Sequence, residues 1–474
     1  MAHLKEKLKK GQLLENVEFV DISAEGMGIG RTKDNVVVFC EGVVPKDIAD
    51  VKITKIKGSF VIAEVDKITQ LSIYRVNSFC KHFGHCGGCK WQHLSYETQL
   101  LFKKKFIEDA LKRIGNLSYP SIEEPLRSPE IKYYRNKLEF TFSNKRWVEP
   151  EFYNKEKSEI LPALGFHKSG AFDKVLDIHQ CYLQNDISNQ IRNFVREYAL
   201  KNNIPFFDIK NHQGILRTLT IRNTTLDEWM VILGVYEIKE KIIFPLLDAL
   251  YEKFPFIQSL LYAHLFMANE SLSNGKLYLY RGKEYITEQL GHLMFKISPN
   301  SFFQTNSLQA KRMYDIVKEY AQLSGNEIVY DLYCGTGTIG LYVADKSKKV
   351  IGVEYVQAAV DDARENAQVN GVSNVAFFAG DIKDLLSDDF VIQNGKPDVI
   401  ITDPPRAGMH KDVIQQIRKI APKRIVYVSC SPPSQARDIS FLSDMYSIQK
   451  VQPIDMFPHT THIENVVLLE RKMD

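Results

Sequence analysis

The last third of the chain alternates short apolar runs with polar and glycine-containing stretches. The apolar runs, rich in valine and isoleucine, occupy residues 328–330, 350–353, 375–379, 399–402 and 424–428. Their length and β-branched content indicate buried strands. Residues 307–320 and 339–344 have the pattern of helices on either side of the first run. Strands that alternate with helices predict an α/β fold, and we expect this Rossmann-like domain to occupy residues 291–474.

The start of the chain has a different pattern, with β-branched, partly alternating segments close together at residues 36–39, 51–56 and 60–65. Several short strands within about 60 residues predict a small β-barrel of the oligonucleotide-binding kind. We expect this barrel to span residues 11–70, with Cys40 as a small core residue. The stretch resembles a TRAM domain, an RNA-binding barrel that is appended to RNA-modifying enzymes.

Residues 71–290 predict a mixed α/β central region, with a helix over 96–115 and strands at 216–222 and 229–235. Within the helix, the run Lys103–Lys105 is expected on a solvated face rather than in a binding site. Residues 132–147 interleave basic and aromatic side chains. That mixture suits stacking on unpaired bases together with phosphate contacts, and it suits an ordinary alternating strand equally well.

Composition limits the classes of protein that fit. The 474 residues predict two to four domains, and 44% apolar with 25% charged residues are ordinary globular values. A net charge of +3 means that any affinity for nucleic acid comes from local patches. No apolar run approaches the length of a membrane span. Seven cysteines in a chain this long do not form a disulfide framework, so we expect a cytoplasmic monomer with reduced thiols.

A cysteine-rich segment at residues 80–89 is a candidate metal site. Cys80, Cys86 and Cys89 are spaced C-x5-C-x2-C, and Cys181 is the best candidate for a fourth ligand. A [4Fe-4S] cluster is the favoured occupant, because the intervening glycines free backbone N–H groups to bond cluster sulfur. Structural zinc, with ligands from His82, His85 or His93, and unliganded thiols are the alternatives.

The glycine turn after the first strand is a candidate ligand site. Asp331 precedes it, and Gly335 and Gly337 form it. No Lys-Ser/Thr follows the turn, so it is not a phosphate loop. Glu354 ends the second strand, where a carboxylate suits a ribose diol. Asp381 ends the third strand and is placed to accept from an adenine amino group. This arrangement resembles an S-adenosyl-L-methionine-dependent methyltransferase.

Reactive side chains follow later strands. Asp403, Pro404, Pro405 and Arg406 follow the fourth strand; an aromatic in place of Arg406 would indicate an amino-group methyltransferase. Cys430 ends the fifth strand at the carboxyl edge, where a thiol is placed for nucleophilic work. The polar residue Gln304 precedes the helix that leads into the glycine turn, and Glu464 precedes a final apolar strand.

Together these motifs resemble the RNA uracil-5 methyltransferase family, over nearly the whole chain after residue 10. The resemblance implies that Gln304, Tyr333, Glu354 and Asp403 contact S-adenosylmethionine. It further implies that Cys430 adds to C6 of uracil and that Glu464 removes the proton from C5. Two residues depart from common family choices, Thr338 and Ser431, and these bear on donor contacts rather than on the chemistry.

The barrel and the four-cysteine pattern resemble the 23S ribosomal RNA branch of the family. That resemblance implies that unassembled 23S rRNA is the substrate. A tRNA-modifying enzyme is the nearest alternative, and a non-catalytic RNA-binding protein is a more distant one. The fold class that we expect is α/β: a small N-terminal barrel, a mixed α/β central domain carrying an iron–sulfur cluster, and a C-terminal methyltransferase domain.

Overall fold

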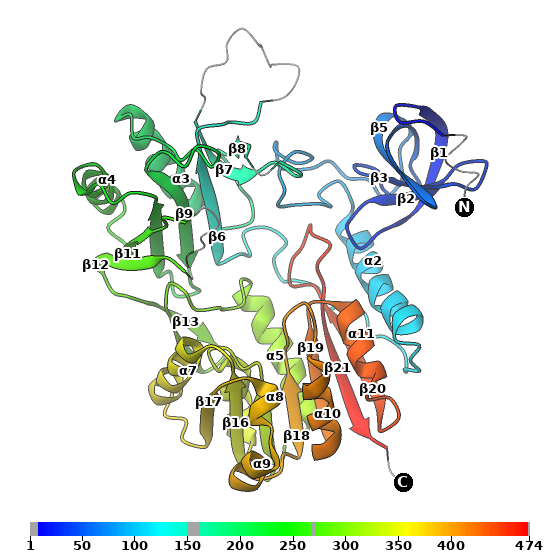
Figure 1. Ribbon diagram of the computed structural model, residues 1–474, viewed down its shortest axis with the longest axis vertical. Helices are drawn as coiled ribbons and strands as arrows, with labels where there is room; N and C mark the ends of the chain where they lie inside the picture. Colours follow the sequence, from blue (N-terminus) through cyan, green and yellow to red (C-terminus); the bar gives the residue numbers. More distant parts are fainter. Residues whose placement is uncertain (1–7, 149–161, 172, 268–271, 273, 473–474) are drawn as a thin grey trace. The chain divides into compact units, whose positions relative to one another are not determined.

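The computed structural model describes residues 8–148, 162–171, 173–267, 272 and 274–472 (Figure 1). It divides into two compact units. The first contains the chain up to Phe106 together with Phe457–His462, and the second contains Ile107–Met456 and the chain from Ile463 onward. Six residues near the C-terminus therefore belong to the first unit, although the chain on both sides of them belongs to the second. No helix in the described part of the chain has the length and apolar character needed to cross a membrane.

The first unit begins with a closed five-stranded barrel, as predicted. Its strands follow the order β1-β2-β3-β5-β4, with bounds β1 Leu13–Ile22, β2 Gly28–Arg31, β3 Val37–Cys40, β4 Ile48–Lys57 and β5 Phe60–Gln70. Alternate side chains point inward, and Val17, Phe19 and Val51 are buried at its centre. Cys40 is fully buried in the same core, which raises the pKa of its thiol to about 12. The prediction that Cys40 is a core residue is confirmed.

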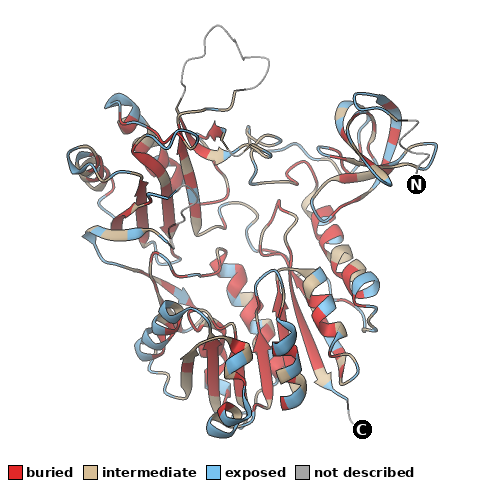
Figure 2. Ribbon diagram, in the orientation of Figure 1, coloured by how far each residue is buried: buried red, intermediate tan, exposed pale blue. Residues whose placement is uncertain are grey.

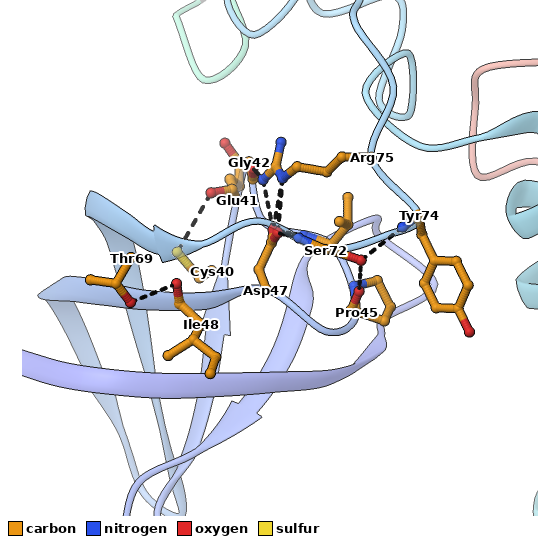
Figure 3. Close-up of polar contacts among 11 residues, drawn as sticks. Cys40, Glu41, Gly42, Pro45, Asp47, Ile48, Thr69, Ser72, Tyr74 and Arg75 are labelled. Carbon is orange, nitrogen blue, oxygen red and sulfur yellow. Dashed lines mark hydrogen bonds and ion pairs between the residues drawn. The ribbon is translucent and has the colours of Figure 1, made fainter.

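A buried aspartate fixes the chain where it leaves the barrel (Figure 3). Asp47 has no exposed surface, and its carboxylate accepts from the Arg75 guanidinium at 2.7 and 2.9 Å. It also accepts from the backbone N–H groups of Val44 at 2.7 Å and Ser72 at 2.9 Å. A buried carboxylate is stable only when it is paired and hydrogen-bonded in this way. Asp47 thus anchors the segment after β5 to the loop before β4.

The helix predicted at residues 96–115 is confirmed as α2 (Tyr96–Asp109) followed by a π-helical turn (Ala110–Ile114). The expectation of a solvated Lys103–Lys105 face is wrong for Lys103, which is completely buried. Its ammonium donates to the carbonyl of Phe457 at 3.1 Å. Helical spacing puts Lys103 one turn beyond the buried Gln99, on the same face of α2. Lys105 instead pairs with Asp21 of the barrel at 2.8 Å.

The C-terminal segment Phe457–His462 is bound tightly within the first unit. Gln99 accepts from the backbone N–H of His459 at 2.8 Å, while its amide donates to the carbonyls of Trp91 and Leu94. The N–H groups of Lys90 and Trp91 both donate to the carbonyl of His459. His459 is buried and has a left-handed backbone with φ of 64°. These contacts give His459 a structural role in the fold.

The second unit contains a mixed sheet and the predicted Rossmann-like sheet. The mixed sheet has the order β12-β11-β10-β9-β6-β7-β8, with all pairs antiparallel except β10–β11. Its strands are β6 Lys137–Ser143, β7 Ala163–His167, β8 Val175–Asp177, β9 Leu216–Asn223, β10 Trp229–Val235, β11 Ile257–His264 and β12 Lys276–Gly282, and its helices are α3 Asp186–Lys201 and α4 Glu240–Lys253. The strands predicted at 216–222 and 229–235 are β9 and β10. A short hairpin, β13 Ile286–Leu290 and β14 Leu293–Ile297, follows them.

The Rossmann-like sheet has the order β17-β16-β15-β18-β19-β21-β20 (Figure 1). The five predicted strands are parallel neighbours, and β21 is antiparallel to both β19 and β20. The strands are β15 Ile328–Leu332, β16 Lys349–Glu354, β17 Val375–Ala379, β18 Val399–Thr402, β19 Arg424–Ser429, β20 Tyr446–Ile454 and β21 Glu464–Arg471. The order of the parallel strands reverses between β15 and β18, which makes a ligand crevice at their carboxyl ends.

Helices cover the faces of this sheet, and its strands are buried while the outer helix faces are exposed (Figure 2). They are α5 Ser307–Ala321, α6 Thr338–Val343, α7 Gln357–Val369, α8 Ile382–Leu385, α9 Asp388–Asn394, α10 Lys411–Ile420 and α11 Pro432–Ser440, with a 3₁₀ turn at Ala344–Lys346. Asn306 caps α5 by accepting from the N–H of Gln309 at 3.2 Å. The predicted α/β fold is confirmed.

Candidate active site

The glycine turn between β15 and α6 has a backbone that requires glycine. Gly337 has φ of 77°, and a Cβ there would lie 2.8 Å from the Phe377 ring and 3.0 Å from the Ala363 side chain. Gly335 also has a positive φ, of 53°, but no protein atom lies within 4 Å of the position its Cβ would take. Asp331 is buried beneath the turn and accepts from the Gly340 N–H at 2.8 Å. The turn therefore leaves its backbone accessible beside Gly335 and is closed on the side of Gly337.

Three predicted donor-binding residues lie in one row at the edge of the sheet. Leu332 pairs with Val353 on one side and with Thr402 on the other. The next residue on each strand is therefore Tyr333, Glu354 or Asp403, at the carboxyl ends where ligands bind. The Glu354 carboxylate accepts from the N–H of Gly335 at 3.1 Å, which fixes it beside the open part of the turn.

The row and the turn fit the methyl donor that was predicted from the sequence. Glu354 is only partly buried, so its carboxylate can also accept from the hydroxyls of a ribose. Tyr333 is half-buried, and burial raises the pKa of its phenol to about 12. It is therefore a neutral hydrogen-bonding side chain at physiological pH. Together with Gly335, these side chains offer an open backbone turn and a carboxylate for S-adenosylmethionine.

The other two predicted donor contacts lie in loops. Asp381 caps α8 by accepting from the Lys383 N–H at 3.2 Å, and its hydrogen bond with the Lys383 side chain lowers its pKa. Gln304 is buried, just before the N-cap of α5. The Gln304 carbonyl accepts from the Asn136 amide at 2.9 Å. The roles of Asp381 and Gln304 toward a ligand stay predictions.

Strand pairing brings the predicted nucleophile and base together. The antiparallel ladder between β19 and β21 ends with Ser429 opposite Asn465. Cys430 directly follows Ser429 and Glu464 directly precedes Asn465, and the two side chains are close enough for the Glu464 charge to raise the pKa of the Cys430 thiol. Behind them, Asn465 donates to Gln435 of α11 at 2.7 Å, and Gln435 donates back to the carbonyls of Tyr427 and Asn465. This buried amide pair fixes the strand end that carries the two groups.

The electrostatics of this pair link it to Asp403 and to Arg406. Burial raises the pKa of the Glu464 carboxyl to about 8, and the negative charge of Asp403 raises it further while Arg406 opposes the rise. Burial, Glu464 and Asp403 likewise raise the pKa of the Cys430 thiol to about 11, and Arg406 again opposes the rise through its charge and a hydrogen bond. Burial raises the pKa of Asp403 to about 7. A buried acid next to a thiol and a single nearby guanidinium is typical of a catalytic site.

The role of Arg406 beside the thiol was not identified from the sequence, where this residue served only to exclude amino-group methyltransferases. The available signal was its position directly after the Asp-Pro-Pro strand end. The two departures from common family residues have local partners. Thr338 shares a hydrogen bond of 3.2 Å with the buried Tyr314 hydroxyl, and the Ser431 hydroxyl donates to that of Ser434 at 3.0 Å.

The predicted metal ligands come from both units. Cys80, Cys86 and Cys89 are half-buried in the first unit, and Cys181 is buried in the second. Among the described residues, no group of three or more His, Cys, Asp or Glu side chains is placed to hold a metal ion. The Gly88 N–H donates to Cys86 sulfur at 3.4 Å.

The basic and aromatic stretch at residues 132–147 forms both a strand and an exposed turn. Its middle is β6, where burial lowers the pKa of Lys137 to about 8. Before β6, the Lys132 ammonium lies 5.8 Å from the Tyr182 ring centre, and the exposed Tyr133 ring lies 6.0 Å from the same ring. After β6, Arg146 is exposed and Trp147 is half-buried. Both flanks of β6, therefore, present bases together with aromatics, a combination that suits unpaired nucleotides.

Comparison with known proteins identifies the family. The model for tRNA (uracil-5-)-methyltransferase matches residues 272–472, and the TRAM domain model matches residues 9–65. An uncharacterized RNA methyltransferase of Bacteroides thetaiotaomicron is 48% identical over 95% of this chain and all of its own length. One from Porphyromonas gingivalis is 47% identical over 97% of this chain and all of its own.

A solved structure agrees with this result. The Pyrococcus abyssi tRNA (uracil-54, C5)-methyltransferase, in complex with S-adenosyl-L-homocysteine, is 27% identical with a TM-score of 0.73. The match covers 95% of this chain and 99% of that enzyme. The chain has a TRAM barrel, a Rossmann-like sheet and an RNA methyltransferase relative that is 48% identical. It therefore belongs to the tRNA (uracil-5-)-methyltransferase family of S-adenosylmethionine-dependent RNA methyltransferases.

Proposed function

We propose that this protein methylates C5 of a uridine in 23S rRNA through a covalent adduct between Cys430 and C6 of the base. The observation that carries the proposal is the end of the β19–β21 ladder at Ser429 and Asn465, next to which Cys430 and Glu464 lie close enough for the Glu464 charge to raise the pKa of the Cys430 thiol. Carbon 5 of uracil is a weak nucleophile, and thiolate addition at C6 makes it enolate-like. A thiol and a carboxylate side by side are what this route needs.

S-adenosylmethionine supplies an electrophilic methyl group, and Gln304, Tyr333, Glu354, Asp381 and Asp403 are the residues that would hold it. Cys430 gives its proton to solvent, and the thiolate forms a bond from sulfur to C6 as the electrons of the C5–C6 π bond pass onto the uracil ring as an enolate. Arg406 favours the thiolate, because it is the positive group that lowers the pKa of Cys430. After C5 has been methylated, Glu464 takes the C5 proton, and the electron pair of the C5–H bond expels Cys430 sulfur from C6. The enzyme then regains its thiol.

Two RNAs are candidate substrates, 23S rRNA and tRNA. The exposed turn at residues 132–135 and the barrel support local contacts with an unpaired RNA loop, whose uridine must leave its stack. A tRNA substrate is supported by the likeness to the Pyrococcus enzyme, a tRNA (uracil-54, C5)-methyltransferase that matches 95% of this chain. That coverage means that the barrel does not by itself separate the two substrates. The cysteine pattern at residues 80–89 favours 23S rRNA over tRNA.

The assignment is tested with labelled S-adenosylmethionine and separate pools of unassembled 23S rRNA and tRNA. We expect label in 5-methyluridine of 23S rRNA, and no transfer by Cys430→Ala although that variant still binds the donor. Methylation of tRNA at equal or greater efficiency would transfer the assignment to the tRNA alternative. Turnover by Cys430→Ala near the wild-type rate would exclude the covalent route.

We also propose that Cys80, Cys86, Cys89 and Cys181 bind a [4Fe-4S] cluster. The support is their sequence spacing, and no catalytic step is assigned to the cluster. Protein purified without oxygen should be brown and contain about four irons. One equivalent of zinc without visible absorption would indicate the structural-zinc alternative.

A further inference from the structure

The loop that carries Gln304 is held by a neighbouring sheet. It joins β14 to α5 and has no regular structure of its own. Arg222 of β9 donates from its guanidinium to the carbonyls of Ser298 at 2.9 Å and Ser301 at 2.7 Å. On the other side of the loop, Asp362 of α7 accepts from the hydroxyls of both serines. The first half of the loop is therefore fixed from two directions.

The second half of the loop is held by Asn136, which immediately precedes β6. Its backbone N–H donates to the Thr305 carbonyl at 2.8 Å, and its side-chain amide donates to the Gln304 carbonyl at 2.9 Å and to the Ser307 hydroxyl at 2.8 Å. In the β6–β9 ladder, Arg222 is paired with Lys137, the residue after Asn136. The two loop-binding residues thus lie at the same end of the β6–β9 strand pair.

Burying the Arg222 guanidinium in this place costs folding free energy. Its side chain is 4% exposed, and burial lowers the pKa of its guanidinium to about 10. Within the described residues no carboxylate forms an ion pair with it, and the neighbouring Lys137 carries the same charge. A buried cation of this kind destabilises a fold unless fixed hydrogen bonds compensate. Here the loop carbonyls of Ser298 and Ser301 are among the compensating hydrogen-bond acceptors. We therefore attribute to Arg222 the function of fixing the geometry of this loop.

We infer that Arg222 and Asn136 are positioning residues for the methyl-donor loop, and that they act by fixing the backbone that presents Gln304 to the donor. The inference rests on the proposed donor contact of Gln304. Arg222 and Asn136 together bind four backbone carbonyls of the loop, those of Ser298, Ser301, Gln304 and Thr305. Because these bonds restrict the peptide planes, the Gln304 side chain is in place before the donor binds. Loss of one holding residue should weaken donor binding and leave RNA binding unchanged.

A second arginine of β9 provides a matched control. Arg217 is also buried, and its guanidinium also donates to two loop carbonyls, those of Leu265 and Met267. Lysine keeps the charge at either position but cannot reach two carbonyls with a planar fork. We expect Arg222→Lys to raise the dissociation constant for S-adenosylmethionine roughly tenfold or more, and Arg217→Lys to change it less than twofold. Calorimetric titration measures both, with melting curves to compare stability.

Asn136→Asp is a second, nearly isosteric test, because it replaces the amide donor by a carboxylate that cannot donate to the Gln304 carbonyl and repels it. It should weaken donor binding while the KM for RNA stays within twofold of the wild type. Gln304→Ala should weaken donor binding as well, and adding Arg222→Lys to it should have little further effect if both act through the same side chain.

The outcomes distinguish the positioning role of Arg222 from the proposed donor contact of Gln304. Equal donor affinity in Arg222→Lys and Arg217→Lys, with weakened binding in Gln304→Ala, would overturn the positioning role and leave the proposed donor contact intact. Full additivity of Arg222→Lys and Gln304→Ala would also overturn the positioning role. Unchanged donor affinity in Gln304→Ala would overturn the donor contact and the inference with it.

Discussion

At the scale of single residues, the candidate site depends on which groups carry protons. Burial keeps the Cys430 thiol protonated at neutral pH and raises the pKa of Glu464 to about 8. Arg406 is the group that opposes both shifts.

Replacement of Glu464 by glutamine should separate methyl transfer from product release. The amide is nearly isosteric but cannot take the C5 proton, so the methylated base stays bonded to Cys430. We expect a protein–RNA species that survives a denaturing gel and carries the labelled methyl group. Glu470→Gln, at the far end of β21, is the control and should form none. Release of methylated RNA at the normal rate by Glu464→Gln would assign the proton transfer to another group.

The rate of adduct resolution should rise with pH. Only the carboxylate form of Glu464 accepts the proton, and because its pKa is raised to about 8, this form is scarce at pH 6 and becomes dominant above pH 8. Below pH 8 the rate should increase nearly tenfold per pH unit. Single-turnover measurements from pH 6 to pH 9 test this. A rate that is flat between pH 6 and pH 8 would contradict the role of Glu464.

The residues that sequence analysis could place are those at strand ends. Cys430, Asp403 and Glu354 each follow an apolar run, and a run of that length has few alternatives to a buried strand. Lys103 and Arg406 were not recognised, because a charged side chain finds its partner through tertiary contacts that periodicity does not contain. Whether the four cysteines meet is likewise a matter of chain folding over long sequence distances.

At the scale of secondary-structure elements, two pieces determine the site: the turn from β15 to α6 and the β19–β21 pair. The turn was predicted, because its glycines and the flanking apolar runs are local features. The pairing was not, because β21 lies between β19 and β20 although β20 precedes it in the chain. The proximity of Cys430 and Glu464 follows from that strand order.

The turn is sensitive to a single methyl group. Gly337→Ala would require a left-handed backbone and would push into the Phe377 ring and the Ala363 side chain. We expect loss of measurable donor binding together with a lower melting temperature. Gly371→Ala is the control for backbone strain, since Gly371 also has a positive φ, of 63°, but has open space around it. Donor affinity in Gly337→Ala equal to that of Gly371→Ala would show that the turn tolerates displacement.

At the scale of the whole molecule, the barrel is expected to bind RNA and not to react. Deletion of residues 1–70 should raise the KM for RNA more than it lowers kcat. The deletion also removes Asp47, which leaves the Arg75 guanidinium without its carboxylate, so the remaining chain should melt at a lower temperature. Arg75→Met in the full-length chain is the control for that loss. A fall in kcat with unchanged KM would contradict a binding role for the barrel.

The placement of residues 457–462 has a consequence for biosynthesis. The first unit, built mostly from the start of the chain, is completed by a segment that lies 350 residues beyond Phe106. At roughly 5–20 residues per second, a ribosome takes on the order of 20–70 s to make that interval. Until then, Gln99 lacks the His459 N–H that it accepts from, and the Lys103 ammonium lacks the Phe457 carbonyl. The part of the protein that is synthesised first is therefore among the last to reach its final fold, and a nascent chain stalled before residue 457 should remain sensitive to proteases around α2.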